Sequence, residues 1–204
     1  MTKKEDNALV LDFLPSGVAG EARKQPIVQL VGESYFTLLD AQASAGFSFS
    51  ALDRVFIGKG ERQGIEQIRG RIAYAQLTST AQRELPSAVE SIVKAREAEF
   101  VGFLNRAGPI NIRAHSLELL PGIGKKHLEE ILRQRESKPF GSFEDVTARV
   151  SHLGDASEIF SRRILDELSG EQKYYIFTRG PPEEREGDYR FDRSDGRYTG
   201  RNRY

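Results

Sequence analysis

The chain has 204 residues, enough for one large domain or two small ones. Lysine plus arginine and aspartate plus glutamate both total 30, so the net charge is zero and any basic surface for a nucleic acid must be local. There is no cysteine, which excludes disulfides, zinc–thiolate sites and cysteine catalysis and suits a reducing compartment; we expect a cytoplasmic location. No long apolar run follows the charged N-terminus, so we expect neither a signal peptide nor a membrane span.

Residues 1–80 predict a small β domain. Short apolar runs bounded by glycine, proline and serine are typical of strands. We expect strands at residues 8–14, 27–31, 35–39, 54–57 and 65–74, with loops at 15–26 and 41–50. This pattern indicates a small barrel, for which an OB-like barrel is the natural candidate. A different small barrel or a curled sheet fits the pattern as well.

Basic residues gather on the later strands and turns of this β domain. They are Arg54, Lys59, Arg62, Arg69 and Arg71. Such a set offers phosphate contacts to a nucleic acid, but it is equally compatible with an ordinary solvated face.

The pattern becomes helical near residue 78. A short helical or turn segment at 78–85 precedes Ser87, which forms a capping-box pattern with Glu90 and predicts a helix start there. Apolar residues then follow one helical face until a Gly-Pro pair ends it. We expect residues 81–109 to connect the barrel to a helical domain at 110–170.

The sequence Leu-Pro-Gly-Ile-Gly-Lys-Lys-His at residues 120–127 is the most informative stretch. Its proline stops an expected helix over 110–120, its glycines permit backbone angles closed to other residues, and the isoleucine plugs the gap between two helices. The next helix begins with unpaired N–H groups beside two lysines, which suits a phosphate. This predicts a helix–hairpin–helix phosphate site made by Gly122, Ile123, Gly124, Lys125, Lys126 and His127. The alternative is a plain glycine-rich turn between core helices.

A second helix–turn–helix follows about thirty residues later. We expect Ser142 and Asp155 to cap its helices and Gly170 to end the second one. This copy lacks the proline and has one glycine where the first has two. We expect it to be structural, although Arg162 and Arg163 lie near its second helix start.

Residues 173–178 predict a last strand that returns to the barrel edge. From 179 to 204 the chain is rich in glycine, proline, arginine and aspartate without apolar periodicity, so we expect disorder. The interleaved tyrosines and arginines of this tail suit RNA contacts by stacking and charge, and equally a solvated tail.

Five motifs resemble one archaeal family of uncharacterised proteins, described as predicted nucleic-acid-binding OB-fold proteins with a helix-hairpin-helix domain. They are ESYFTLL (33–39), RVFIGK (54–59), AGPI (107–110), LELLPGIGKK (117–126) and PFGSFED (139–145). The resemblance spans residues 7–178 and implies an α+β protein with an OB-like N-terminal barrel and a (helix-hairpin-helix)2-like helical half. It implies no activity, because the family has none assigned. The basic tract usual before the lysine-containing turn is replaced here by an Ala- and Ser-rich segment at 41–50.

We expect no enzymatic activity, metal or cofactor. The histidines at 115, 127 and 152 form no metal-ligand pattern, and Gly58-Lys59-Gly60 lacks the residues of an NTPase phosphate loop. DNA glycosylases with this hairpin carry a catalytic aspartate or lysine soon after it. Here that window holds Lys138, which is more simply a charged helix end.

The sequence therefore predicts a non-catalytic nucleic-acid-binding protein, with RNA favoured over DNA and contacts to the phosphate backbone. The alternatives are a protein–protein adaptor, with partners in translation or RNA processing, and an accessory subunit of a nucleic-acid-processing enzyme. No membrane partner is expected.

Overall fold

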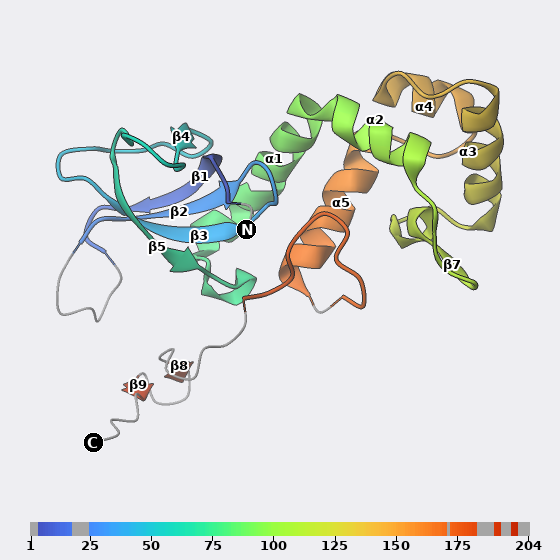
Figure 1. The fold of residues 1–204 in the computed structure, drawn as a ribbon. Helices are drawn as coiled ribbons and strands as arrows, with labels where there is room; N and C mark the ends of the chain where they lie inside the picture. Colours follow the sequence, from blue (N-terminus) through green and yellow to red (C-terminus); the bar gives the residue numbers. More distant parts are fainter. Residues whose placement is uncertain (1–3, 18–24, 171, 183–189, 193–196, 200–204) are drawn as a thin grey trace.

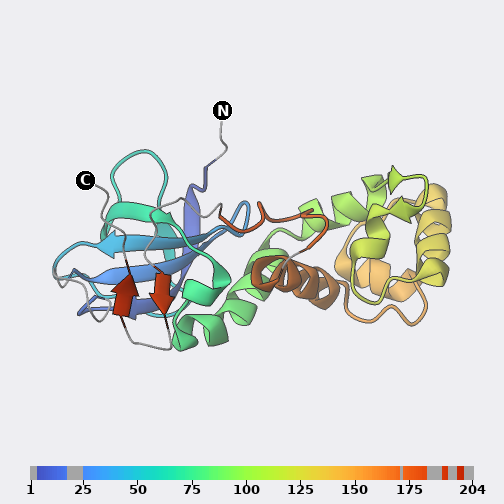
Figure 2. The same cartoon turned by 90° about the horizontal axis from the view of Figure 1, so that it is seen from below.

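The structure is a computed structural model that describes residues 4–17, 25–170, 172–182, 190–192 and 197–199. A curled β sheet lies at one end of the molecule and a group of helices at the other (Figure 1). Helices α1 (Ser79–Ala95) and α5 (Ala156–Ser169) run side by side between the two ends, as Figure 2 also shows. The predicted α+β class is confirmed.

The apolar runs near the N-terminus pair into one antiparallel sheet. Its strands are β1 (Asn7–Leu14), β2 (Ile27–Gly32), β3 (Leu38–Ala43), β4 (Arg54–Phe56) and β5 (Ile65–Arg71). They pair in the order β4-β1-β2-β3-β5. Both faces of the sheet are buried: on β1, Ala8 and Val10 join a cluster inside the curl, while Leu9 and Leu11 join the core shared with the helices. This is the two-residue alternation of a strand.

Strand β3 begins later than predicted and ends later. The buried carboxylate of Glu5 accepts the backbone N–H groups of Ser34, Tyr35 and Thr37 at 2.8, 3.0 and 3.2 Å, which holds this segment in a turn. Pairing with β2 and β5 then carries the strand to Ala43, through residues that we expected in a loop.

The sheet curls without closing into a barrel. β4 and β5 are its two edges, and among the described strands they do not pair with each other. Because β4 is antiparallel to β1, and β5 is antiparallel to β3, the two edge strands run in the same direction. Closure requires paired edges, so the fold is a half-barrel, the curled sheet that the sequence pattern also allowed.

The helical half begins earlier than predicted. After η1 (Tyr74–Gln76), the side chain of Thr78 caps α1 by accepting the N–H of Ala81. The predicted start at Ser87 is wrong, and Pro86 lies inside the helix. A continuous buried face, made by Ala81, Leu85, Ala88, Val89, Ile92 and Val93, outweighs the hydrogen bond that proline cannot donate. A break at Arg96 separates α1 from α2 (Glu97–Arg106), so the predicted connector is two helices.

Residues 110–120 are not the predicted α-helix. The chain here forms β6 (Pro109–Asn111), β7 (Ala114–His115) and η2 (Ser116–Leu119). The Asn111 side chain accepts the N–H of Arg113 and makes a tight turn, and the flanking isoleucines favour strand. Leu117 and Leu120 are nevertheless buried, as expected.

The remaining helices are α3 (Lys125–Ser137), α4 (Phe143–Arg149) and α5. The predicted caps of the last two are confirmed. The Ser142 hydroxyl accepts the N–H of Asp145 at 3.1 Å, and the Asp155 carboxylate accepts that of Ser157 at 2.7 Å. Gly170 follows the end of α5, as predicted.

Residues 173–178 form no strand, so that prediction is wrong. The buried carboxylate of Glu167 accepts the N–H groups of Ile176, Phe177 and Thr178 at 2.9, 3.1 and 2.9 Å. It also pairs with Arg163 at 2.9 Å. These bonds hold the segment beside α5 and use the amides that a sheet would need.

The C-terminal tail was expected to be disordered. The structure describes two strands in it, β8 (Arg190–Asp192) and β9 (Arg197–Thr199), which pair with each other and place Phe191 opposite Tyr198. Aromatic residues favour strands, which the compositional prediction did not weigh. The predicted RNA contacts at 189, 193, 201, 203 and 204 lie outside the described residues.

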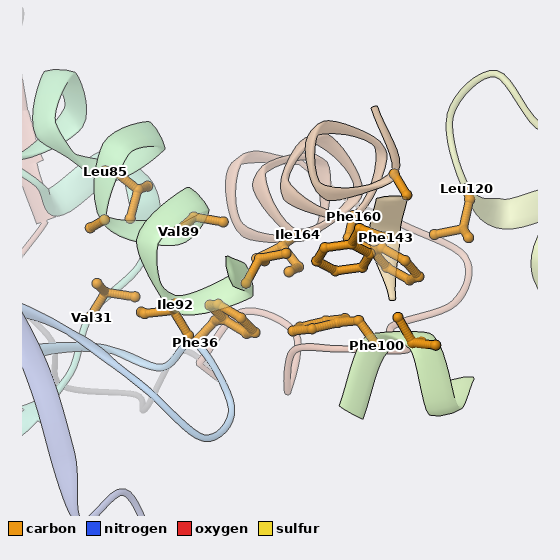
Figure 3. Packing of buried hydrophobic residues seen from close by; sticks show 14 of the residues in the cluster. Val31, Phe36, Leu85, Val89, Ile92, Phe100, Leu120, Phe143, Phe160 and Ile164 are labelled. Carbon is orange, nitrogen blue, oxygen red and sulfur yellow. The ribbon is translucent and has the colours of Figure 1, made fainter. Parts of the chain in front are cut away.

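One hydrophobic cluster joins the sheet to the helices. Phe36 follows β2, Phe100 lies on α2, Phe160 on α5 and Phe143 on α4, and Figure 3 shows them in succession. Ring centroids are 6.4 Å apart for Phe36–Phe100, 5.0 Å for Phe100–Phe160 and 5.9 Å for Phe143–Phe160. This shared core fixes the β lobe relative to the helices that carry the hairpin.

Candidate nucleic-acid interface

The hairpin at residues 121–124 has the bend that the sequence predicts at one of its two glycines. Gly122 has φ +81, a left-handed conformation that favours glycine. Ile123 is 5% exposed and belongs to the main core, so it fills the gap as expected. Gly124 differs from the prediction: at φ −92 and ψ −177 its backbone is open to any residue.

The start of α3 is uncapped by any side chain. Its N-cap is Gly124, whereas Thr78, Ser142 and Asp155 cap α1, α4 and α5 through their side chains. The carbonyl of Gly124 accepts the N–H of Leu128 at 2.9 Å, but the amides of residues 125–127 have no acceptor among the described residues. A Cβ added at Gly124 would meet no heavy atom within 4 Å. Open amides and open space therefore coincide at the positive end of this helix.

The two lysines of the motif stand at this helix start. Lys125 and Lys126 are exposed, and neither forms an ion pair within the described part of the chain. The Nδ1 atom of His127 lies 2.8 Å from the carbonyl oxygen of Gly122, so the ring fastens the bend to the helix. Two cations at a positive helix end repel its dipole, an arrangement that an anion relieves.

Three of the five basic residues predicted on the β lobe are engaged within the protein. Arg54 binds both carboxylate oxygens of Glu33, at 2.6 and 2.9 Å. The hydrogen bond and charge of Glu33 raise the pKa of Arg54. Arg62 donates to the Gly58 carbonyl at 3.0 Å, and Arg71 to that of Gly180 at 2.6 Å. Burial, together with the charge of Arg179, lowers the pKa of Arg71.

The other two, Lys59 and Arg69, are exposed. They do not share a strand: residue 59 follows β4 and residue 69 lies on β5, the opposite edges of the sheet. The hairpin and α3 lie at the far end of the molecule from both edges (Figure 1). The structure thus brings together the six hairpin residues, but it does not unite them with the β-lobe cations.

The second helix–turn–helix, formed by α4 and α5, lacks these features. The Asp155 carboxylate occupies the first amides of α5, and Arg163 is buried in its ion pair with Glu167. Arg162 is exposed. This geometry fits the structural role that we expected.

Comparison with known proteins gives the chain a family. A family model described as "Protein of unknown function (DUF655)" matches residues 4–179. The chain belongs to this family. An uncharacterized protein of Methanocaldococcus jannaschii, MJ0038, is 41% identical over 179 residues, which cover 87% of this chain and 81% of that protein. The crystal structure of Af1531 from Archaeoglobus fulgidus, a DUF655 protein, matches with a TM-score of 0.79 and 41% identity, over 85% of this chain and 99% of that one.

The DUF655 match includes a cavity that the sequence did not predict. We call it the junction cavity: about 520 Å³ between the loop at 34–36, helix α2, residues 107–108, Ser116 and the segment 176–177. Aromatic rings and two arginines, Arg96 and Arg106, line it. The sequence gave no signal for it, because its walls come from segments far apart in the chain.

No group of three or more His, Asp or Glu side chains suited to a metal ion occurs in the described part of this DUF655 chain. The helices described are all too short or too polar to cross a lipid bilayer.

Proposed function

We propose that the protein binds nucleic acid through the phosphate backbone, RNA in preference to DNA, and catalyses no reaction on it. The hairpin at 121–127 acts as a helix-hairpin-helix element. The observation that carries this proposal is the start of α3, where three amides lack an internal acceptor beside two unpaired, exposed lysines. Such a helix start is a ready phosphate site.

The bond geometry assigns a role to each hairpin residue. The first-turn amides of α3 donate to phosphate oxygens, and Lys125 and Lys126 neutralise the charge. Gly122 and Ile123 shape and anchor the bend, and His127 fastens it. Gly124 keeps the approach to the amides open. Contacts of this kind position a strand without reading its bases.

The β lobe acts in this proposal as an OB-like half-barrel with a smaller share of the binding. Arg54, Arg62 and Arg71 already bond to protein acceptors, so Lys59 is the β-lobe cation best placed to meet a phosphate. The preference for RNA rests on the OB-like interpretation and on the Arg- and Tyr-rich tail.

Fluorescence anisotropy with the full-length protein tests the proposal. The probes are one labelled sequence as single-stranded RNA, single-stranded DNA and RNA duplex. We expect RNA binding that weakens as salt rises. The Lys125→Ala/Lys126→Ala variant should bind more weakly and lose about 1.4 from the salt slope, about 0.7 for each lost phosphate contact on a single strand.

The matched control is Arg83→Ala/Lys94→Ala, which removes two exposed cations from α1. It should bind like the wild type. Absence of binding to all three probes at low salt, or equal losses in both double variants, would overturn the proposal.

A protein–protein adaptor is the second candidate, because Ile112 at the tip of the β6–β7 hairpin is 105% exposed and Ile110 is 36% exposed. This function predicts partners that co-purify after nuclease treatment and are lost from an Ile112→Ser variant. Nuclease-sensitive co-purification favours nucleic-acid binding instead.

A further inference from the structure

The junction cavity lies beside the hairpin along the chain. The N–H of Ser116, in its wall, donates to the carbonyl of Gly108, also in its wall, at 3.1 Å. Six residues separate Ser116 from Gly122, and such a segment spans at most about 22 Å. A strand whose backbone is held at the hairpin is therefore within reach of the cavity over a few nucleotides.

The inner surface of the cavity is aromatic. Phe100 and Phe103 come from α2, Phe177 from the segment held by Glu167, and Tyr35 and Phe36 from the loop held by Glu5. The Arg96 guanidinium carbon lies 5.5 and 5.6 Å from the ring centroids of Phe36 and Phe100. Aromatic faces and guanidinium planes are what unstacked bases stack on.

The charges at the rim leave one cation unpaired. Arg96 pairs with Glu99, at 2.7 Å, and also donates to the carbonyl of Glu33. Arg106 is exposed and has no hydrogen bond or ion pair within the described residues. The rim is thus positive by one charge, which complements a phosphate.

Gly102 gives the Arg106 side chain its position. A Cβ at Gly102 would lie 2.9 Å from Nη2 and 3.0 Å from Nη1 of Arg106, so the guanidinium rests where this buried helical residue has no side chain. Alanine is the better helix former, so an alanine here would displace the guanidinium without weakening the helix.

We propose that the junction cavity takes one unstacked base of a single-stranded nucleic acid, with Arg106 on an adjacent phosphate, while the hairpin holds the backbone. This deepens the proposed function and rests on it. The volume of about 520 Å³ is in the range of pockets that hold small ligands. A duplex would have to flip a base out to use the cavity, so single strands are preferred.

Binding of the full-length protein to matched single-stranded and duplex RNA tests this inference. The single strand also carries 2-aminopurine, whose fluorescence reports base stacking. We expect tighter binding of the single strand and a fluorescence change on binding. Arg106→Ala should weaken single-strand binding about tenfold, as expected for one lost charged hydrogen bond, and leave duplex binding unchanged.

Gly102→Ala provides the second variant. It should weaken single-strand binding in the same direction while the melting temperature stays equal or rises, which separates displacement of Arg106 from damage to the fold. Arg83→Ala, another exposed helical arginine, is the matched control and should bind like the wild type.

Two outcomes separate the possible failures. If Arg106→Ala and Gly102→Ala bind both RNA forms like the wild type, while Lys125→Ala/Lys126→Ala binds weakly, the cavity has no role and the hairpin proposal stands. If no RNA form binds the wild type, both proposals fail.

Discussion

The imidazole Nδ1 atom of His127 lies 2.8 Å from the carbonyl oxygen of Gly122, on the inner side of the hairpin bend. The contact joins a left-handed glycine to the first turn of α3. Because a ring nitrogen and not an amide meets that carbonyl, the amides of residues 125–127 keep no acceptor among the described residues. The bend is thus fixed while the helix start remains open, which is the condition for an anion site.

Gly124→Ser should stabilise the fold and weaken RNA binding. The backbone of Gly124 already has the extended N-cap conformation, and a serine there meets no neighbouring atom within 4 Å of its Cβ. Its hydroxyl can accept a first-turn N–H, which changes stability by a few tenths to about 1 kcal/mol in favour of the folded state. The same bond occupies an amide that phosphate would use. Urea unfolding and RNA anisotropy measure the two effects.

Gly124→Ala is the control for volume, because it adds a methyl group without a hydrogen-bond acceptor. It should not raise stability. If Gly124→Ser gains stability and still binds RNA like the wild type, phosphate does not use these amides.

How far the sequence predicts this structure depends on the range of the interactions. The caps at Ser142 and Asp155, the turn at Gly122 and the buried Ile123 were all foreseen, because each depends on neighbours within a few residues. The helix start at Thr78 was missed, because its effect combines with a buried face that only the tertiary structure provides.

The larger errors concern contacts between distant segments. Residues 173–178 have a strand-like composition, but Glu167 takes three of their amides. Arg54 looks like a free surface cation in the sequence, but Glu33, on another turn, neutralises it. No local pattern distinguishes a paired arginine from an unpaired one, so the candidate site could be predicted at the hairpin and not on the β lobe.

Arg54→Ala should leave RNA affinity unchanged. Its guanidinium is held by both oxygens of Glu33, so it offers little net charge to a phosphate. The pair is partly exposed, and its loss should change the free energy of unfolding by less than about 1 kcal/mol. Lys59→Ala is the comparison, since it removes an exposed β-lobe cation and should weaken binding. A weaker Arg54→Ala variant beside an unaffected Lys59→Ala variant would reverse this assignment.

His115 should make stability depend on pH. Burial, aided by the charge of Arg135, lowers the pKa of His115, and the neutral ring accepts the N–H of Leu117 at Nδ1, at 3.1 Å. The unfolded chain, where histidine has its usual pKa of about 6.5, binds the proton more readily. The free energy of unfolding should therefore fall as pH drops below about 6.5.

His115→Asn tests this dependence, because an asparagine oxygen accepts the same N–H and does not titrate. Urea unfolding at pH 7.5 and 5.5 should show a smaller pH effect in this variant than in the wild type. The matched control is His152→Asn, an exposed position with φ 60 that asparagine tolerates. A pH effect that disappears in the control and persists in His115→Asn would contradict the assignment.

Glu167→Gln should be strongly destabilising. Glu167 is 1% exposed and Arg163 is 6% exposed, so removing the carboxylate charge leaves a buried guanidinium without its partner. Breaking such a pair costs about 3–5 kcal/mol, which urea unfolding should detect. The amide that replaces one carboxylate oxygen also presents donors to the N–H groups of Ile176, Phe177 and Thr178.

The control for Glu167→Gln is Glu90→Gln, which breaks an exposed pair with Lys94 and should change stability little. Phe177 lines the junction cavity, so loosening its segment should also weaken single-strand binding, under conditions where the variant is still folded. A variant as stable as the wild type would mean that the contacts of Phe177 with Phe100, Phe103 and Phe160, and not the Glu167 carboxylate, hold this wall of the cavity.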